Sequence, residues 1–416
     1  MKHEDSEFDE ATVQEAQRQL ERIRRGAVQI VSEHELLHRI SKSLVEARPL
    51  RVKLGVDPTA HDLHLGFTLP LSKLQIFSEL GHQPVLIIGD ATAMVGDPTG
   101  RNKARPRLTR AMVDDFAQSY LDQASRVLDM ERVEVRRNSE WLESLGFMGT
   151  VQLAAKATVA RMLERDDFSK RYAEGTPIYI HEFIYPLMQG YDSVVVQSDV
   201  ELGGQDQLFN LLVGRDLQSD AGMAPQCCVM GPLLVGLDGS RKMSKSYDNY
   251  IGVTDDPVDM FGKVMSLPDE VMRDWFELVT DLPLDEVADL FAKGLHPRLL
   301  KERLGRTIVE RFHDDEAAEL GASEFARVFS RRELPSEMSD FLVPETEFED
   351  GRIRLVRLVV AAGFAPSNKE AGRLIEQGGV SLDGEAHTDK SATVMIDGGE
   401  ILRVGKKRFA RLTRAH

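Results

Sequence analysis

Two short stretches of the chain carry residue types suited to binding a phosphate. The first, DPTAHDLHLGF, places His64 and Gly66 between an apolar run and an amphipathic one. A histidine at a helix N-terminus suits an anion, because imidazole and free backbone N–H groups converge there and the helix dipole favours negative charge. The second, KMSKS, holds Lys242 and Lys245 in a loop, where two ammonium groups can close on a pyrophosphate and neutralise developing charge. Alone, each stretch also fits a plainer reading: a surface or core histidine, and a solvated lysine-rich loop.

The segments around the first stretch predict a strand, a helix and a second strand. RVKLGV precedes it and PVLIIGD follows it, both as short apolar runs of the kind found in parallel sheets. Between them, residues 66–80 show helical spacing of apolar side chains, with Pro70 near the first turn and Gly81 as the stop. The loop after the first strand of such a βαβ unit lies at the carboxyl edge of the sheet, where ligands bind. We therefore expect His64 at a ligand site.

The remaining pattern predicts three domains. Residues 109–190 read mostly as helix with two interruptions, and the sheet is expected to resume with SVVVQS and CCVMGPLLVG, just before the KMSKS loop. Residues 255–339 read as helical again, and an acidic stretch, VPETEFEDG, precedes a basic tail. We expect an α/β fold: a Rossmann-like parallel-sheet catalytic domain at 1–254 with a helical insertion at about 109–190, a helical domain at 255–340, and a small α+β domain at 351–416.

Composition narrows the class of protein. A chain of 416 residues suggests two to four domains, and with 42% hydrophobic and 29% charged residues it contains no apolar run long enough to span a membrane. The acidic start MKHEDSEFDE lacks the apolar core of a secretory signal, so we expect a cytoplasmic protein. The two cysteines, Cys227 and Cys228, are adjacent and give neither a disulfide framework nor metal-ligand spacing, so no protein-bound metal is predicted.

Charge is distributed unevenly along the chain. The net charge is −16, which argues against a nucleic-acid partner, but residues 351–416 carry 12 Lys+Arg against 7 Asp+Glu. A basic tail on an acidic body allows local phosphate binding while the rest stays soluble. A merely solvated basic surface explains the charge equally well.

Taken together, the two stretches resemble a known family. HLGF and KMSKS look like the two signatures of class I aminoacyl-tRNA synthetases, and GVDPT, GDPTGR, YPLMQGYD and LGGQDQLFN are similar to segments of the bacterial tyrosyl-tRNA synthetase family. The tail segment APSNKEAGRLIEQGGVSLDG resembles an S4-type RNA-binding fold, so the resemblance runs nearly end to end. It implies a ligase that activates L-tyrosine with Mg²⁺-ATP to tyrosyl-adenylate and transfers the tyrosyl group to tRNA(Tyr).

The resemblance also implies residue roles. The substrate carboxylate attacks the α-phosphate of ATP in this reaction, so the enzyme supplies positioning and charge stabilisation and needs no nucleophile. By similarity, the catalytic residues are Thr59, His64, Arg101, Arg105, Lys242 and Lys245. The ATP-binding residues are Gly55, Asp57, His64, Gly66, Gly204, Asp206, Gln207 and Lys245, with Asp206 on the ribose hydroxyls. The tyrosine-binding residues are Asp97, Tyr185, Gln189, Asp192 and Gln207.

Asp192 is the residue on which specificity would depend. By resemblance it accepts the phenolic hydrogen, so phenylalanine would leave a desolvated acceptor unpaired; this enzyme class is itself the standard example of such rejection. Asp97, Tyr185 and Gln189 would surround the substrate ammonium as a cluster of hydrogen-bond acceptors.

The sequence departs from the family pattern at a few positions. Phe67 replaces the usual second histidine of the first signature, and Leu54 and Pro70 stand where other members offer polar contacts to the ribose. We expect a weaker hold on ATP, because ribose binding would rest largely on Asp206. Lys53 stands where many relatives have a second tyrosine beside the substrate phenol. It could donate to the phenol oxygen or point to solvent, and the sequence does not decide between them.

The resemblance further implies partners. Residues 255–339 resemble an anticodon-proximal helical domain, and the insertion at 109–190 corresponds to a dimer interface, so tRNA(Tyr) and a second copy of the chain are expected partners. Cations in the tail could dock RNA phosphates; those predicted to do so are Lys369, Arg373, Lys406, Lys407 and Arg408.

Three rival functions remain open at this point. One is the tryptophan-specific sister enzyme, against which Asp192 and the S4-like tail argue. Another is a small-molecule nucleotidyltransferase, which would need neither the helical domain nor the tail. A non-catalytic RNA-binding paralogue is the third, and Phe67 gives it some weight.

Overall fold

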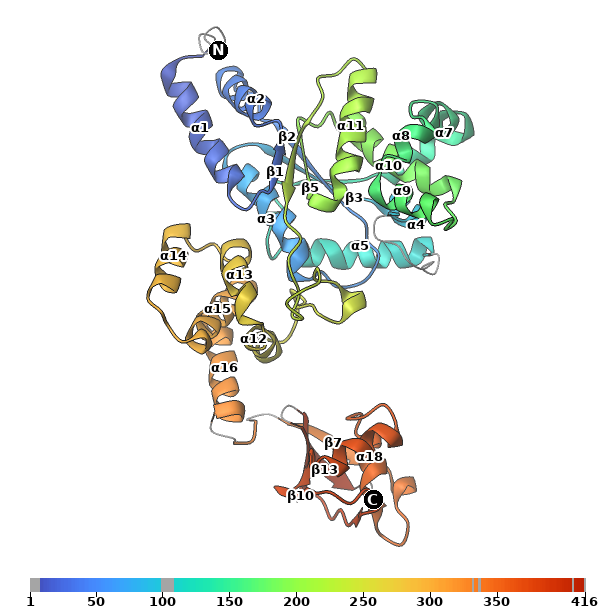
Figure 1. Ribbon diagram of the computed structural model, residues 1–416, viewed down its shortest axis with the longest axis vertical. Coiled ribbons are helices and arrows are strands. Elements are labelled where there is room, and N and C mark those ends of the chain that lie inside the picture. The colour runs from blue at the N-terminus through green and yellow to red at the C-terminus, as the bar shows by residue number, and fades with distance from the viewer. Residues whose placement is uncertain (1–7, 99–107, 331–332, 336–337, 406–407, 415–416) are drawn as a thin grey trace. The chain divides into compact units, whose positions relative to one another are not determined.

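The computed structural model describes residues 8–98, 108–330, 333–335, 338–405 and 408–414 (Figure 1). The chain divides into two compact units. One comprises Met1–Asp256 and Lys263–Phe312, and the other comprises Pro257–Gly262 and His313–His416. Each unit encloses its own set of buried apolar side chains. Within the described ranges, no helix has both the length and the apolar character needed to cross a bilayer.

A six-stranded sheet forms the centre of the first unit. Its order is β1-β6-β5-β2-β3-β4; β1 runs antiparallel to β6, and the other neighbours are parallel. The strands are β1 (Gln29–Val31), β2 (Arg51–Val56), β3 (Gln83–Ile88), β4 (Glu134–Arg137), β5 (Val200–Gly204) and β6 (Cys227–Gly231). The chain moves outward from β2 through β3 and β4 on one side, and through β5 and β6 on the other. The crevice between β2 and β5 is therefore the switch point at which such sheets bind ligands. The predicted parallel-sheet α/β fold is confirmed.

The helices of this unit are α1 (Glu10–Arg24), α2 (Glu33–Glu46), α3 (Leu65–Glu79), α4 (Asp90–Val95), α5 (Arg110–Ala124), α6 (Ser139–Leu142), α7 (Gly146–Ala154), α8 (Val159–Met162), α9 (Asp166–Ala173), α10 (Ile180–Val195), α11 (Leu208–Asp220), α13 (Met272–Val279), α14 (Leu284–Ala292) and α15 (Pro297–Phe312). Single 3₁₀ turns lie at η1 (Glu143–Leu145), η2 (Gln205–Gln207), η3 (Lys245–Tyr247) and η4 (Asp269–Val271). As the sequence predicted, α3 follows β2 directly and keeps Pro70 within it.

Two glycines let α10 and α11 pack closely, side by side (Figure 1). A Cβ at Gly190 of α10 would lie 2.9 Å from Leu217 Cδ1 and 3.1 Å from the Gly214 backbone nitrogen. A Cβ at Gly214 of α11 would lie 2.7 Å from the side-chain nitrogen of Gln226. Because neither glycine carries a side chain, α10 approaches both α11 and the sheet edge that forms the ligand site.

Two segments differ from the sequence prediction. β4 lies within residues 109–190, which were predicted as mostly helix with two interruptions. β4 is an edge strand whose residues, EVRR, are mostly charged. Charged side chains keep an exposed sheet edge from pairing with other chains. They also interrupt the apolar pattern from which a strand is predicted. Residues 193–198 were predicted as a strand, but residues 193–195 end α10. Packing on α11 outweighs the strand preference of this β-branched run.

The second unit is a small β-rich domain with short helices. Its five-stranded sheet has the order β10-β9-β12-β13-β7, and β11 pairs with β8. The strands are β7 (Ser339–Val343), β8 (Ile353–Arg354), β9 (Val380–Leu382), β10 (Glu385–His387), β11 (Thr393–Val394), β12 (Ile401–Val404) and β13 (Arg408–Arg414). The helices are α16 (Asp315–Phe325), a π turn at Ala326–Ser330, η6 (Glu345–Glu347), α17 (Leu355–Ala361) and α18 (Asn368–Glu376). The division between the units falls inside α12 (Pro257–Met265). Apolar residues of α17, α18 and the strands form the core, and Ser367 caps α18.

Candidate active site

His64 caps the amino end of α3, just beyond the carboxyl end of β2. Its Nδ1 accepts a hydrogen bond from the Gly66 amide at 3.2 Å, so the neutral ring carries its proton on Nε2 and can donate from there. A Cβ at Gly66 would lie 3.0 Å from the imidazole, so glycine keeps room for this ring position. Backbone hydrogen bonds join residues 63–65 to residues 251–253, which follow the KMSKS loop.

The two lysines of the KMSKS loop lie close to this histidine. Lys245 donates from its ammonium group to the Asp62 carbonyl, and Lys242 Nζ lies 3.1 Å from Asp206 Oδ2. Burial, and then the positive charges of Lys245 and Lys242, lower the pKa of His64 to about 4. The imidazole is therefore neutral at pH 7. The structure thus brings together four of the predicted site residues, contributed by the ends of β2 and β5 and by the loop after β6.

Asp57 lies in the loop after β2, within a cluster of acidic groups. It accepts hydrogen bonds from Thr92 Oγ1 at 2.7 Å and from the Tyr185 hydroxyl at 2.9 Å. Burial is the largest cause of a pKa raised to about 7, and the negative charges of Asp97 and Asp192 add to it. The family resemblance assigned Asp57 to ATP binding and Tyr185 to tyrosine binding. In the structure, the two side chains are hydrogen-bonded to each other.

A chain of amides connects α10, α11 and the loop after α4. Gln207 donates to Asp97 at 2.9 Å, and Asn210 donates to the side-chain oxygens of Gln207 at 2.8 Å and Gln189 at 3.0 Å. Arg165 lies 3.2 Å from Asp97 and is itself almost fully buried. Asp97, Gln189 and Gln207 were predicted, whereas Arg165 and Asn210 were not. Asn210 fixes the side-chain oxygens of both predicted amides, and Arg165 contacts Asp97 and the side-chain oxygen of Asn210, the latter at 3.4 Å.

Asp192 lies on the buried face of α10. Its carboxylate accepts hydrogen bonds from Trp141 Nε1 at 2.8 Å and from Asn138 Nδ2 at 3.3 Å. Burial raises the pKa of Asp192 to about 7, against the opposing effect of the Lys53 charge. Two neutral donors therefore hold this carboxylate in place, and its protonation state is finely balanced at neutral pH.

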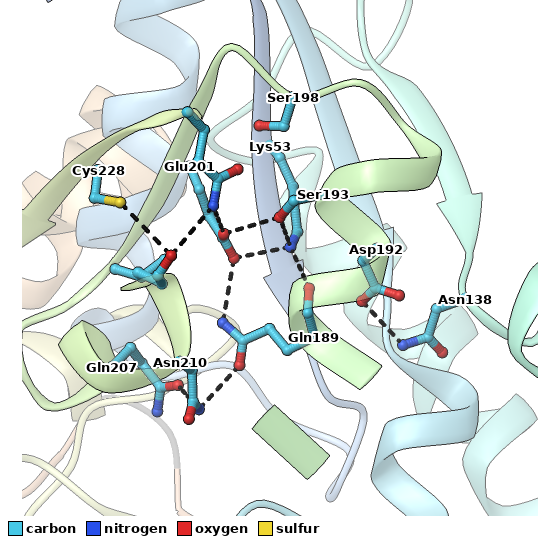
Figure 2. Close-up of polar contacts among 12 residues, drawn as sticks. Lys53, Asn138, Gln189, Asp192, Ser193, Ser198, Glu201, Gln207, Asn210 and Cys228 are labelled. Atoms are coloured by element: carbon cyan, nitrogen blue, oxygen red, sulfur yellow. Dashed lines mark hydrogen bonds and ion pairs between the residues drawn. The ribbon is translucent and has the colours of Figure 1, made fainter. Parts of the chain in front are cut away.

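Lys53 of β2 lies in the interior beside this carboxylate (Figure 2). Its ammonium donates to the Gln189 carbonyl, to Ser193 Oγ and to Glu201 Oε1, each at 2.8 Å. An ammonium group has three N–H donors, and all three are used. Lys53 therefore neither points to solvent nor keeps a donor for a substrate phenol, the two alternatives that the sequence left open. Its partner Glu201 was not predicted; a carboxylate in the otherwise apolar start of β5 was the available signal.

The other predicted residues of the first unit lie at the same edge of the sheet. Thr59 is hydrogen-bonded to Tyr120, whose pKa is raised to about 12 chiefly by burial. Gly55 of β2 is exposed, with open space where a Cβ would be, and a Cβ at Gly204 would lie 2.8 Å from Asp206 Oδ1. Arg101 and Arg105 fall outside the described residues.

Phe67 lies against the signature histidine. Its ring centroid is 4.7 Å from that of His64 and 6.3 Å from that of Tyr120. The ring also lines a small apolar cavity with Val56, Leu63, Leu71, Leu86, Ile88, Tyr120 and Ala124. The position that commonly holds a polar histidine is therefore part of an apolar packing surface in this chain.

The cations predicted to bind RNA lie in the second unit. Lys369 and Arg373 are exposed on α18, and Arg373 is 2.6 Å from Glu370. Arg408 is exposed at the start of β13 and donates to the Phe364 carbonyl. Lys406 and Lys407 fall outside the described residues.

Comparison with known families agrees with this geometry. Residues 45–330 match a family model described as tRNA synthetases class I (W and Y), and residues 337–412 match one described as the tyrosine--tRNA ligase SYY-like C-terminal domain. The fold is thus that of a class I tRNA synthetase. The chain is 52% identical to the tyrosine--tRNA ligase of Symbiobacterium thermophilum, over 95% of this chain and 97% of that protein. It is 50% identical to that of Aquifex aeolicus, over 95% and 98% respectively. The chain belongs to the tyrosine--tRNA ligase family, which confirms the resemblance.

Solved structures show the same fold. The tyrosyl-tRNA synthetase from Archaeoglobus fulgidus, solved as a complex with L-tyrosine, aligns with a TM-score of 0.60 at 25% identity. The alignment covers 73% of this chain and 99% of that one. A truncated mitochondrial tyrosyl-tRNA synthetase from Aspergillus nidulans aligns with a TM-score of 0.63 at 21% identity, over 77% and 98%.

Proposed function

We propose that the chain activates L-tyrosine with ATP and transfers the tyrosyl group to the 3′-terminal ribose of tRNA(Tyr). The observation that carries the proposal is the meeting of neutral His64 with Lys242 and Lys245 at the switch point of a parallel sheet. Mg²⁺ enters with ATP as part of the substrate complex. The proposed location is the cytoplasm.

In the activation step, a tyrosine carboxylate oxygen attacks the α-phosphorus and pyrophosphate leaves. Negative charge then grows on the β- and γ-phosphates, where the Lys242 and Lys245 ammonium groups and the His64 Nε2–H stabilise it. Both lysines are bonded to protein oxygens, so ATP binding exchanges these for phosphate oxygens. Release of Lys242 frees Asp206 to accept the ribose hydroxyls. Thr59, Arg101 and Arg105 are proposed to assist at the same phosphates.

Backbone positions complete the proposed ATP site. Gly55, Gly66 and Gly204 carry no side chain where the nucleotide would approach the ends of β2 and β5, and open space surrounds the first of them. Gln207 is proposed to lie near the α-phosphate and the substrate carboxylate. Its hydrogen bond to Asp97 keeps this amide beside the acidic cluster.

The acidic cluster is suited to the substrate ammonium group. The negative charges of Asp97 and Asp192 raise the cost of ionising Asp57, and a cation bound beside Asp97 would lower that cost. Asp97, Tyr185 and Gln189 are proposed to surround the ammonium, with Asp57 supporting Tyr185. Asp192 is proposed to accept the phenolic O–H, since Trp141 and Asn138 already fix its carboxylate.

Exchange of labelled pyrophosphate into ATP tests this proposal. We expect exchange that depends on tyrosine, not on tryptophan or phenylalanine, and that falls at least 100-fold in Asp192→Ala, as expected when a site built to bond a hydroxyl loses its acceptor. Exchange with tryptophan would instead identify the tryptophan-specific sister activity. Absence of exchange with every amino acid would identify an RNA-binding paralogue.

A homodimer is the proposed assembly. Apolar side chains that are 63–81% exposed gather in the segment between α6 and α10: Phe147, Met148, Val159, Tyr172, Tyr179 and Ile180. Exposed apolar groups in such number mark an interaction surface on soluble proteins. Phe147→Asp combined with Ile180→Asp should halve the mass measured by sedimentation equilibrium. An unchanged mass would refute this interface.

The tRNA is proposed to contact the helical segment at 255–340 and the small domain at 351–416, the domain division predicted from the sequence. Support comes from the charge of the second range and from the exposed cations on α18. Phosphate contacts of this kind position an RNA and do not by themselves read its sequence.

A further inference from the structure

We propose that Lys53 and Glu201 act as a positioning pair, which anchors the substrate-facing side of α10 and favours the charged form of Asp192 for tyrosine recognition. The inference rests on the proposed function and assigns roles to two residues that touch no substrate. The pair joins adjacent strands at the switch point, β2 and β5, and is fully withdrawn from solvent, with side chains 0% and 1% exposed.

The first role is mechanical. Lys53 donates to two groups of α10 that lie one helical turn apart, the Gln189 carbonyl and Ser193 Oγ. Glu201 accepts from the Gln189 side chain at 3.2 Å and from the Ser193 hydroxyl at 3.0 Å. The same turn of α10 is thus held by both charges (Figure 2). Asp192 lies on this turn, between the two anchored residues in sequence.

Glu201 is also fixed from the opposite side. The Gln226 side-chain amide donates to its second oxygen, and Gly214 of α11 leaves space for this contact because a Cβ there would lie 2.7 Å from the amide nitrogen and 3.3 Å from that oxygen. Every donor of the ammonium and both oxygens of the carboxylate therefore have protein partners. A buried ion pair with complete hydrogen bonding is a rigid element.

The second role is electrostatic. The charged groups with the largest effect on Asp192 are Lys53 from β2 and Glu201 from β5. Asp57 from the loop after β2 and Tyr185 from α10 lie close enough for the charge of Asp192 to raise their pKa values. Of these four groups, only Lys53 carries a positive charge that favours ionised Asp192. It lowers the pKa of Asp192 against burial, and Glu201 raises it by a smaller amount. A protonated Asp192 would donate a hydrogen and lose its value as a phenol acceptor.

The test compares variants that keep the volume of the pair while changing its charge. Lys53→Met with Glu201→Gln removes both charges and leaves no unpaired buried ion. Its tyrosine kcat/KM, which reports the free enzyme, should have a pH midpoint about one unit above that of the unmodified chain. At pH 6 this corresponds to a roughly tenfold loss of tyrosine kcat/KM. The KM for ATP should not change.

Glu201→Gln alone should move the same midpoint downward, because Lys53 then acts on Asp192 without opposition. Shifts of opposite sign in the two variants cannot arise from loosened packing alone. The matched control is Lys73→Met, which removes another largely buried lysine whose ammonium donates to the carbonyls of Ile23 and Arg25. This control should unfold at a lower temperature and keep the midpoint of the unmodified chain.

The outcomes separate the two proposals. If the unmodified chain shows no tyrosine-dependent exchange, the proposed function fails and this inference fails with it. If the unmodified chain is active but the midpoint stays fixed in both pair variants, only the positioning pair is wrong. Equal rises in KM for tyrosine and ATP, or a midpoint shift in Lys73→Met, would also overturn it. Should the double variant not fold, the downward shift in Glu201→Gln still decides the question.

Discussion

Asp57 and Asp192 share an unusual property for aspartates, because each has a pKa of about 7 within a single cluster. Burial favours the neutral form of both, and nearby negative charges add to it. A substrate ammonium group placed beside Asp97 would favour the ionised form of Asp57, and binding should release protons near neutral pH. Tyrosine affinity is accordingly expected to rise as pH increases through 7.

Asp192→Asn should change how stability depends on pH. The folded-state pKa of Asp192 is raised from 3.8 to about 7, so its contribution to stability is fully present below pH 3.8 and is lost as pH rises through 7. The unmodified chain should therefore lose about 2–3 kcal/mol relative to the variant between pH 5 and pH 8. Urea unfolding at both pH values measures this, with Asp122→Asn, an exposed residue of α5, as the control. Parallel pH profiles for the unmodified chain and Asp192→Asn would contradict the prediction.

Phe67→His should strengthen the hold on ATP. It places a polar ring beside His64, where the signature commonly carries a second histidine, and should lower the ATP KM several-fold. The same change puts a polar group into the apolar surface shared with Leu71 and Leu86, so stability should fall by about 1–2 kcal/mol. Pyrophosphate exchange at varied ATP, together with thermal unfolding, measures both effects. An unchanged ATP KM would mean that Phe67 does not limit ATP binding.

At the scale of elements, the contact between α10 and α11 positions α10, which carries residues of the proposed tyrosine site. Gly190→Ala should destabilise the protein by about 1–3 kcal/mol, because the added methyl meets Leu217 and the rigid backbone of Gly214. It should also raise the tyrosine KM more than the ATP KM, since α10 carries Gln189 and Asp192. Gly262→Ala in α12 is the matched control: its Cβ would meet nothing within 4 Å, and stability should stay equal or rise slightly. Equal effects of the two changes would refute this account of the packing.

The strongly patterned elements were predictable from the sequence. β2 is a short, largely apolar run and β3 a continuous one, α3 begins at a capping residue and ends before Gly81, and α18 begins after Ser367. β4 was missed because a charged edge strand lacks the apolar signal. The end of α10 was misassigned because its SVVV run favours a strand locally and only the neighbouring α11 makes it helical.

The candidate site likewise contains residues that were predictable from the sequence and residues that were not. His64, Lys242 and Lys245 stand in motifs whose chemistry can be read directly, and the structure brings them together. The pairing of Lys53 with Glu201 could not be predicted, because it depends on β2 and β5 being neighbours in the sheet although the two residues are 148 positions apart in sequence. Asn210 and Arg165 hold other residues of the site in place. Their roles could not be predicted either, because they depend on contacts that only the fold creates.

At the scale of the whole molecule, the basic small domain should govern RNA binding without affecting tyrosine activation. Lys369→Ala with Arg373→Ala should weaken tRNA(Tyr) binding and reduce the slope of log K against log salt by about 1–2. Filter binding between 50 and 300 mM salt measures this slope. Tyrosine-dependent exchange, which involves no RNA, is the control and should stay at the level of the unmodified chain. A salt slope unchanged in the double variant would assign RNA binding to other residues.

The Lys53–Glu201 contact also constrains the order in which the chain can fold as it leaves the ribosome. β2 is synthesised early and carries an ammonium group that is costly to bury before its carboxylate arrives. That carboxylate lies in β5, which emerges only after the entire segment from α3 to α10. We therefore expect β2 and β5 to pair only after residue 201 has left the exit tunnel, and a chain truncated before that point should leave the Lys53 ammonium without its partner carboxylate.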